Sequence, residues 1–174
     1  MLKRFPKTDQ ILPVYAVGVT IVFSWAIITT TKEMLSNWSL YFNITDILGS
    51  IAYVMAGAFL ESLLLILFLL VIVFILPRKL FLDKFVFRGT ALVISLLATL
   101  MYYYTQTPMG DALENMDKLG VFFLLVFVLI VLGELLQVVD WFVKFIADSC
   151  IVFLYIYLPI SFISILTIIF RNLG

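Results

Sequence analysis

The sequence lacks histidine and contains one cysteine, Cys150, among its 174 residues. Without histidine the chain has neither the commonest metal ligand nor the usual general base at neutral pH. A single cysteine forms no internal disulfide and supplies no paired ligands for zinc. The 8 glycines are scattered and form no phosphate-binding or dinucleotide-binding motif. These absences predict no metal site, no cofactor and no catalytic centre, so we expect the protein not to be an enzyme.

Charged residues are also scarce. They make up 13% of the chain, and hydrophobic residues make up 64%, whereas a typical soluble domain has about 25% and about 45 to 50%. The 11 basic and 11 acidic residues balance, so no net field attracts nucleic acid. This composition predicts an all-α, polytopic transmembrane bundle that occupies residues 1–174 as one integral membrane domain.

Five apolar runs are the candidate membrane spans. A helix needs about 20 apolar residues to cross a hydrocarbon core about 30 Å thick. The predicted spans cover residues 11–31, 47–76, 89–106, 118–139 and 149–170. Pro159 falls inside the fifth span, where it is expected to kink the helix. A four-span alternative, in which the first or third run does not cross, stays open.

The connections between the spans predict the orientation of the chain. The densest basic cluster lies between the second and third spans and consists of Arg78, Lys79, Lys84 and Arg88. Because basic residues favour the cytoplasmic side, we expect this connection and the N-terminus in the cytoplasm. Five spans then place the C-terminal Arg171 outside, against the usual bias. The same four residues are candidates for contact with lipid headgroups, although a topology signal alone explains the pattern.

Glu61 is the most costly residue of the chain. It lies in the middle of the second span, fourteen residues from one end and fifteen from the other. A charge at the bilayer centre costs about 3 kcal/mol on insertion scales. Three states are open: a protonated carboxyl bonded to hydroxyls such as those of Ser24, Ser95 or Thr99, a pair with a basic group of another subunit, or part of an ion path.

Polar and small residues form a stripe on the second span. At 100° per residue, the members of this stripe fall within about 80° of the helix. They are Ser50, Tyr53, Gly57 and Glu61. Gly57 lies one turn from Glu61 and would let a neighbouring backbone approach closely. We expect this stripe to turn away from lipid and to contact another membrane protein or a second copy of the chain.

A second polar line begins near the cytoplasmic end of the fourth span. It starts at Glu134 and Gln137, which are further candidates for contact with a partner. A helix that continues past Val139 extends this line and places Lys144 to pair with Asp140. Such a helix would project into the cytoplasm, or lie on the membrane surface with aromatic side chains in the headgroup layer. These aromatic residues are Trp141, Phe142 and Phe145.

Three functions fit these features to different degrees. The first is a non-enzymatic accessory, anchoring or scaffold subunit of a membrane complex, because the loops are small and the polar stripes suit helix contacts. The alternative is a small oligomeric transporter or channel in which Glu61 binds a proton or a cation. An enzyme acting on lipid would have to use Glu61, tyrosines or the carboxylates of Asp111, Glu114 and Asp117. The composition weakly favours a bacterial plasma membrane.

Overall fold

The computed structural model describes residues 6–33, 43–75, 82–106 and 117–173, and within them all regular structure is helical. The helices are α1 (Thr8–Glu33), α2 (Ile44–Ile75), α4 (Phe85–Gln106), α5 (Asp117–Leu135) and α6 (Gln137–Leu173). The all-α bundle predicted from the composition is therefore confirmed.

Four of these helices are long and apolar enough to cross a membrane. They are α1, α2, α4 and α6, with 26, 32, 22 and 37 residues. α5 has 19 residues, and its described apolar part, Leu124–Gly133, is shorter. The whole of α5, with its 19 residues, extends about 28 Å, close to the thickness of the hydrocarbon core. The prediction of about five spans thus corresponds to four helices of spanning length and a shorter fifth.

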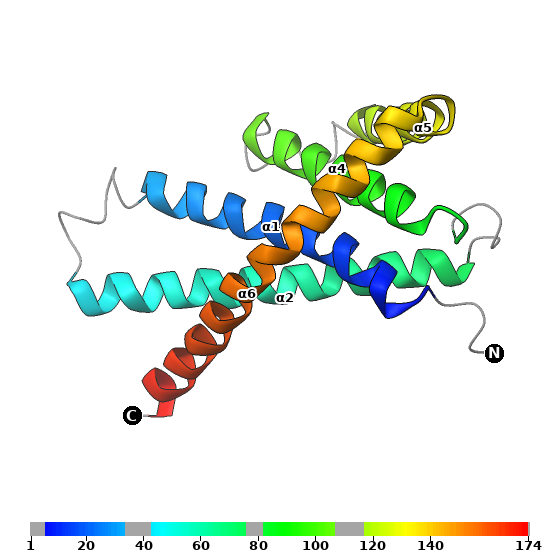
Figure 1. The fold of residues 1–174 in the computed structure, drawn as a ribbon. Coiled ribbons are helices and arrows are strands. Elements are labelled where there is room, and N and C mark those ends of the chain that lie inside the picture. The colour runs from blue at the N-terminus through cyan, green and yellow to red at the C-terminus, as the bar shows by residue number, and fades with distance from the viewer. Residues whose placement is uncertain (1–5, 34–42, 76–81, 107–116, 174) are drawn as a thin grey trace.

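α1 is the central helix of the bundle. It packs against α2, α4 and α6, while α5 packs against α4 and α6. Figure 1 shows α6 crossing α1 and α2 obliquely, and α1 lying between α2 and α4. The start of α1 and the end of α6 consequently lie at opposite ends of the bundle.

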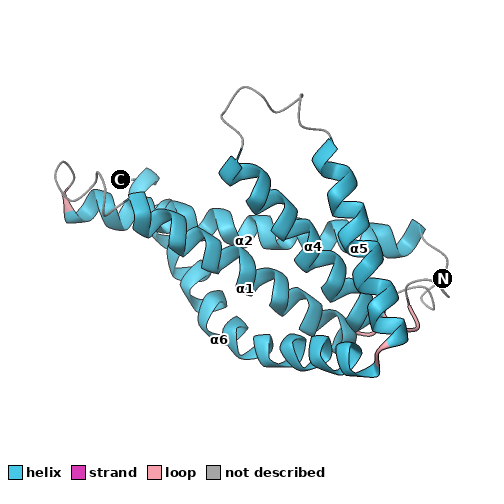
Figure 2. Cartoon of the chain, turned by 90° about the horizontal axis from the view of Figure 1, so that it is seen from above, coloured by secondary structure: helices cyan, strands magenta, loops and turns pink. Residues whose placement is uncertain are grey.

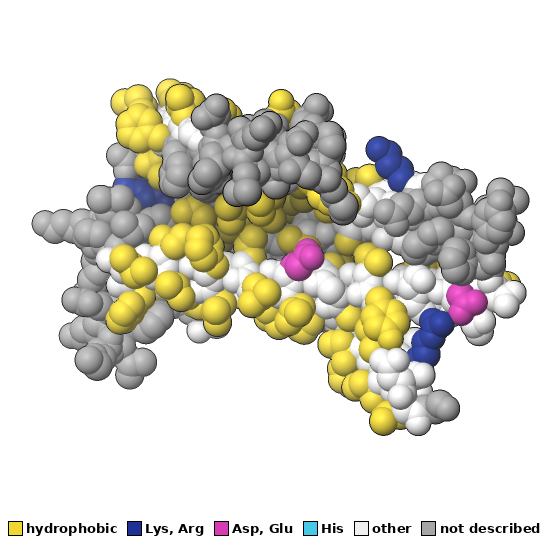
Figure 3. Space-filling view, turned by 180° about the vertical axis from the view of Figure 1, so that it is seen from behind, with side chains coloured by type: hydrophobic (Ala, Val, Ile, Leu, Met, Phe, Trp, Pro, Cys, Tyr) yellow, Lys and Arg dark blue, Asp and Glu magenta, His cyan; other side chains and the backbone are white. Residues whose placement is uncertain are grey.

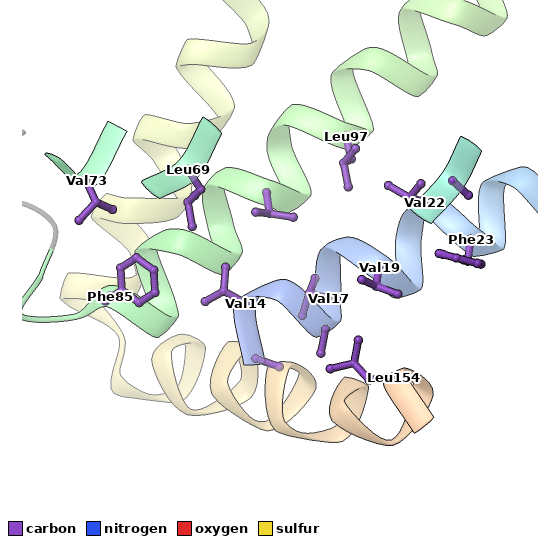
Figure 4. Packing of buried hydrophobic residues seen from close by; sticks show 14 of the residues in the cluster. Val14, Val17, Val19, Val22, Phe23, Leu69, Val73, Phe85, Leu97 and Leu154 are labelled. Carbon is purple, nitrogen blue, oxygen red and sulfur yellow. The ribbon is translucent and has the colours of Figure 1, made fainter. Parts of the chain in front are cut away.

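The hydrophobic core is centred on α1. Its fully buried side chains include Val14, Val17, Val19 and Phe23. Figure 4 shows these residues between buried side chains of the neighbouring helices: Leu69, Val73, Phe85, Leu97 and Leu154. Because lipid tails are as apolar as these side chains, close packing holds the helices together within a membrane.

Glycines allow the closest approaches between helices. A Cβ atom at Gly89 of α4 would lie 3.2 Å from a methyl group of Val14 on α1. A Cβ atom at Gly133 of α5 would overlap the ring of Phe87 on α4. The first contact joins α1 and α4 near their starts, and the second brings the end of α5 to the same region.

The chain breaks its helical path at Leu136, between α5 and α6. The residues past Val139 are helical, as predicted, but the predicted continuation of the fourth helix into them is wrong, because α5 ends at Leu135 and a new helix begins at Gln137. Residues 140–148, expected as the connection between the fourth and fifth spans, are accordingly helical. Gly133 supplies a physical reason for the break, because glycine weakens a helix by about 1 kcal/mol and here yields its space to Phe87.

α6 continues through Pro159 as one helix. Figure 2 shows that α6 bends along its length, as expected for a long helix with an internal proline. Its 37 residues extend about 55 Å, well beyond the thickness of a hydrocarbon core. Part of α6 therefore lies outside the apolar layer, or at its boundary.

Candidate functional site

Glu61 lies deep along α2. It is separated from Ile44 by 17 positions and from Ile75 by 14 positions in a helix of 32 residues. At about 1.5 Å per residue these distances are about 25 Å and about 21 Å. α2 is about 48 Å long and a hydrocarbon core is about 30 Å thick, so a tilted α2 whose two ends lie at the two boundaries holds this carboxyl group near the middle of the core.

The Glu61 side chain is exposed on the surface of the chain. Leu60 and Leu64 beside it are 59% and 57% exposed. Among the described residues no hydrogen bond or ion pair to the Glu61 carboxyl group is formed. The Glu61 carboxyl group is thus open to contact from outside the molecule.

We name the surroundings of Glu61 the outer face of α2. This face consists of the half-exposed Gly57 and the exposed Leu60, Glu61, Leu64, Leu67, Phe68 and Val71. The opposite side of α2 carries the buried residues that pack into the bundle, among them Met55, Ala58, Ser62 and Leu69. Figure 3 shows a largely hydrophobic surface on this side of the molecule, with few charged side chains.

Two of the three hydroxyl groups considered as partners for Glu61 bond elsewhere. Ser95 donates to the carbonyl oxygen of Ala91 at 2.7 Å, and Thr99 donates to that of Ser95 at 2.8 Å. Ser62, which follows Glu61, donates to the Phe59 carbonyl oxygen at 2.7 Å. These bonds stay within one helix, so the described hydroxyls do not solvate Glu61.

The predicted stripe on α2 divides into two parts. Near the start of the helix, Ser50 donates to the carbonyl oxygen of Asp46 at 2.9 Å, and Tyr53 contacts α6. Farther along, Gly57 faces open space, because a Cβ atom there would meet no described atom within 4 Å. No described helix of this chain therefore packs closely against α2 at Gly57.

The first part of the stripe belongs to what we name the α2–α6 polar cluster, formed by Asp46, Gly49 and Tyr53 of α2 with Arg171 and Asn172 of α6. The Arg171 guanidinium donates to Asp46 Oδ1 at 3.0 Å. The Tyr53 hydroxyl donates to Asn172 Oδ1 at 3.2 Å and accepts from Asn172 Nδ2 at 3.1 Å. A Cβ atom at Gly49 would overlap the guanidinium, so a larger residue there would require the flexible end of the Arg171 side chain to shift.

Sequence reasoning missed this polar cluster, although a signal for it was present. Five spans that begin in the cytoplasm place both the start of the second span and the end of the fifth outside. Asp46 and Arg171 carry opposite charges at those two positions. In the predicted topology, this ion pair would account for a basic residue on the side where basic residues are usually scarce.

The second polar line is divided by the break at Leu136. Glu134 lies in the last turn of α5, and its side chain is outside the described part of the structure, whereas Gln137 is exposed at the start of α6. The predicted pair forms, since Lys144 Nζ lies 2.7 Å from Asp140 Oδ2. The structure does not bring Glu61 together with Gln137 or this pair.

The first turns of α6 carry exposed aromatic side chains. Trp141, Phe142 and Phe145 are all more than half exposed, and the rings of Trp141 and Phe145 stack with centroids 5.6 Å apart. Amphipathic aromatic rings settle at the level of the headgroups. With the Lys144–Asp140 pair between them, they suit a helix segment that lies at the membrane boundary.

The basic candidates for headgroup contact gather at the start of α4. Lys84 precedes the helix and Arg88 lies in its first turns, and both side chains are half-buried. Arg78 and Lys79 are outside the described residues. The loop carboxylates Asp111 and Glu114 are also outside them, and so is the side chain of Asp117. Within the described ranges no group of three potential metal ligands is found.

Comparison with protein-family models, with curated proteins and with solved structures gives no match. The fold and the helix lengths define the class: a polytopic, all-α integral membrane protein. Its distinguishing features are the carboxyl group of Glu61 in the middle of α2 and the polar cluster that joins α2 to α6.

Proposed function

We propose that the protein is a non-enzymatic accessory subunit that anchors or positions another membrane protein through the outer face of α2. The observation that carries this proposal is the exposure of Glu61 at mid-helix, about 21 Å or more from either end of α2. Hydrocarbon chains cannot solvate a carboxylate, and a charge left there costs about 3 kcal/mol. A protein partner that covers this face removes that cost.

The contrast between Gly49 and Gly57 supports the same function. At Gly49 the missing side chain is used within the chain, because Arg171 occupies the space. At Gly57, one turn before Glu61, the corresponding space is open. Small residues on transmembrane helices permit close backbone packing with a neighbour. The outer face of α2 thus has a site of close approach beside its polar group.

The proposed topology has the N-terminus in the cytoplasm and five crossings in a bacterial plasma membrane. The grouping of charges supports the orientation: Lys84 and Arg88 lie near the start of α4, at the end of the bundle where α1 begins. Asp46 and Arg171 lie together where α2 begins and α6 ends. The host membrane rests on composition alone.

The native mass of the complex tests the accessory role. The protein is extracted from its own source in a mild detergent, its mass is measured, and every co-purifying chain is identified. We expect a second membrane protein in a fixed ratio that is retained in Leu100→Gln, at an exposed position of α4, and is lost with Gly57→Leu. A preparation that contains only copies of this chain would contradict the accessory role and favour an oligomeric transporter using Glu61.

A further inference from the structure

We infer that the partner places a basic side chain, Lys or Arg, from the middle of one of its own transmembrane helices against Glu61. This inference rests on the proposed accessory function and names the chemistry of the contact. It commits to a different protein, and not to a second copy of the chain, as the occupant of the outer face of α2.

The positions of the basic residues exclude a second copy as the source of the cation. The 11 residues are Lys3, Arg4, Lys7, Lys32, Arg78, Lys79, Lys84, Arg88, Lys118, Lys144 and Arg171. Those in the described part of the chain precede a helix or lie in the first turns or last turn of one, and Lys3, Arg4, Arg78 and Lys79 fall outside the described helices. None is near the middle of α2, where Glu61 lies. Two copies related by an axis normal to the membrane keep their residues at equal depth and bring only carboxyl groups together.

The opposite charge favours a cation over a neutral donor on the partner. Several neutral donors in this chain bond within their own helices. The hydroxyl groups that donate to backbone carbonyl oxygens in this way include those of Ser62, Ser95 and Thr99. Hydroxyls in a membrane helix usually find such local acceptors. A Lys or Arg side chain has no acceptor of this strength in its own helix, and in hydrocarbon it needs an anion as much as Glu61 needs a cation.

The shape of the surface also suits a helix. Gly57, Glu61, Leu64 and Phe68 are spaced four, three and four residues apart and form one ridge along α2. Space is open over Gly57, while Leu64 and Phe68 project on the other side of Glu61. A partner helix can approach closely at Gly57, direct its cation at Glu61 and pack its apolar side chains on Leu64 and Phe68.

Synthetic transmembrane peptides provide the test. Three otherwise identical leucine-alanine helices carry Lys, Leu or Glu at the central position and a fluorophore at one end. The full-length protein, labelled with an acceptor, is reconstituted in phosphatidylcholine vesicles, and energy transfer is measured against peptide density. The variants are Glu61→Gln, Glu61→Lys and, as a control at an exposed position of α4 outside the outer face of α2, Leu100→Gln.

We expect the Lys peptide to associate at least tenfold more strongly than the Leu peptide with the wild-type protein and with Leu100→Gln. Glu61→Gln should reduce this preference to the level of the Leu peptide, and Glu61→Lys should transfer it to the Glu peptide. Equal association of the Lys and Leu peptides, or a preference that persists in Glu61→Gln, overturns the inference. So does energy transfer between two copies of the chain that depends on Glu61.

The native preparation separates this inference from the function beneath it. If the co-purifying protein carries no Lys or Arg in the middle of any span, the inference fails while the accessory role stands. If it carries one, its replacement by Leu should release the partner, and its exchange for Glu should restore binding to Glu61→Lys. A native preparation without a second protein refutes the accessory role and this inference with it.

Discussion

The two halves of α2 differ in how their polar groups are satisfied. In the first half, α6 crosses the helix, and Asp46 and Tyr53 find partners in Arg171 and Asn172. In the second half, no described helix covers the outer face, and Glu61 is left without a partner. Asp46 and Tyr53 have partners within the chain, although water is available near the membrane boundary. Glu61 has none among the described residues, although it lies in the middle of α2, away from the water. We take this difference as the mark of an external interface.

The two ends of α2 should also lie on opposite sides of the membrane. A test of this arrangement gives the largest expected effect. With Cys150 replaced by serine, single cysteines at Lys7 and at Asn172 are treated with a membrane-impermeant maleimide in sealed cells. Five crossings predict labelling of Asn172→Cys only, and Lys7→Cys should react only after permeabilisation. The Asp46–Arg171 ion pair further requires a cysteine at Asn43 to behave like the one at Asn172.

Labelling of Lys7→Cys and Asn172→Cys from the same side would contradict five crossings. It would leave an even number of crossings, and because the Asp46–Arg171 ion pair holds residue 43 on the side of Asn172, it would identify α1 as the helix that does not cross.

The second prediction concerns the uncovered half of α2. Glu61→Gln should weaken the native complex by about 2 to 5 kcal/mol, or about thirtyfold or more, because it leaves the partner's cation buried and unpaired. The isolated chain should lose no stability, since Glu61 has no partner among the described residues. Both quantities can be measured on one preparation, as the fraction of partner retained and as unfolding in mixed micelles. If Glu61→Gln lowered the stability of the isolated chain but retained the partner, Glu61 would act within the chain and not at an external interface.

The sequence predicts the stripe on α2 but not its division. A period of 100° per residue is enough to place Ser50, Tyr53, Gly57 and Glu61 near one side of a helix. Which neighbour covers which part depends on the course of α6, and the Asp46–Arg171 contact joins residues 125 positions apart. Apolar runs carry no information on crossing direction, because lipid and helix are equally good surroundings for them. The position of Glu61 was predictable, whereas its exposure was not.

The same reasoning explains the misplaced connection after the fourth span. Residues 140–148 carry charges, which suggest a boundary, but contain no proline or glycine to end a helix. The break falls earlier, at Leu136, where no local residue type signals a turn. Gly133 precedes it and packs on Phe87 of a different helix. A break set by tertiary packing leaves only a weak trace in the local sequence.

The two glycines of α2 allow a matched test at a smaller scale. Gly49→Leu should destabilise the isolated chain by about 1 kcal/mol or less, because the flexible Arg171 side chain must shift from its place over α2 and lose its exposed contact with Asp46. Gly57→Leu should be neutral or stabilising by up to about 1 kcal/mol, since the space is open and leucine is the better helix former. Unfolding in mixed micelles measures both.

For the complex the order of the two glycine variants should reverse. Gly57→Leu should release the partner, while Gly49→Leu should retain it as long as the chain is folded. Equal effects of the two substitutions on both measurements would show that the halves of α2 do not have separate roles.

The smallest expected effect lies within the α2–α6 polar cluster itself. The Asp46 and Arg171 side chains are 43% and 45% exposed, so solvent weakens their attraction. A double-mutant cycle with Asp46→Asn and Arg171→Gln should give a coupling of about 0.2 to 1 kcal/mol that decreases as salt is added. The same cycle with Tyr53→Phe and Asn172→Leu should give a coupling that salt does not change, because those groups are neutral. A coupling above about 2 kcal/mol for the ion pair would mean that the cluster is shielded from water, and that the covered half of α2 is as dry as the half that carries Glu61.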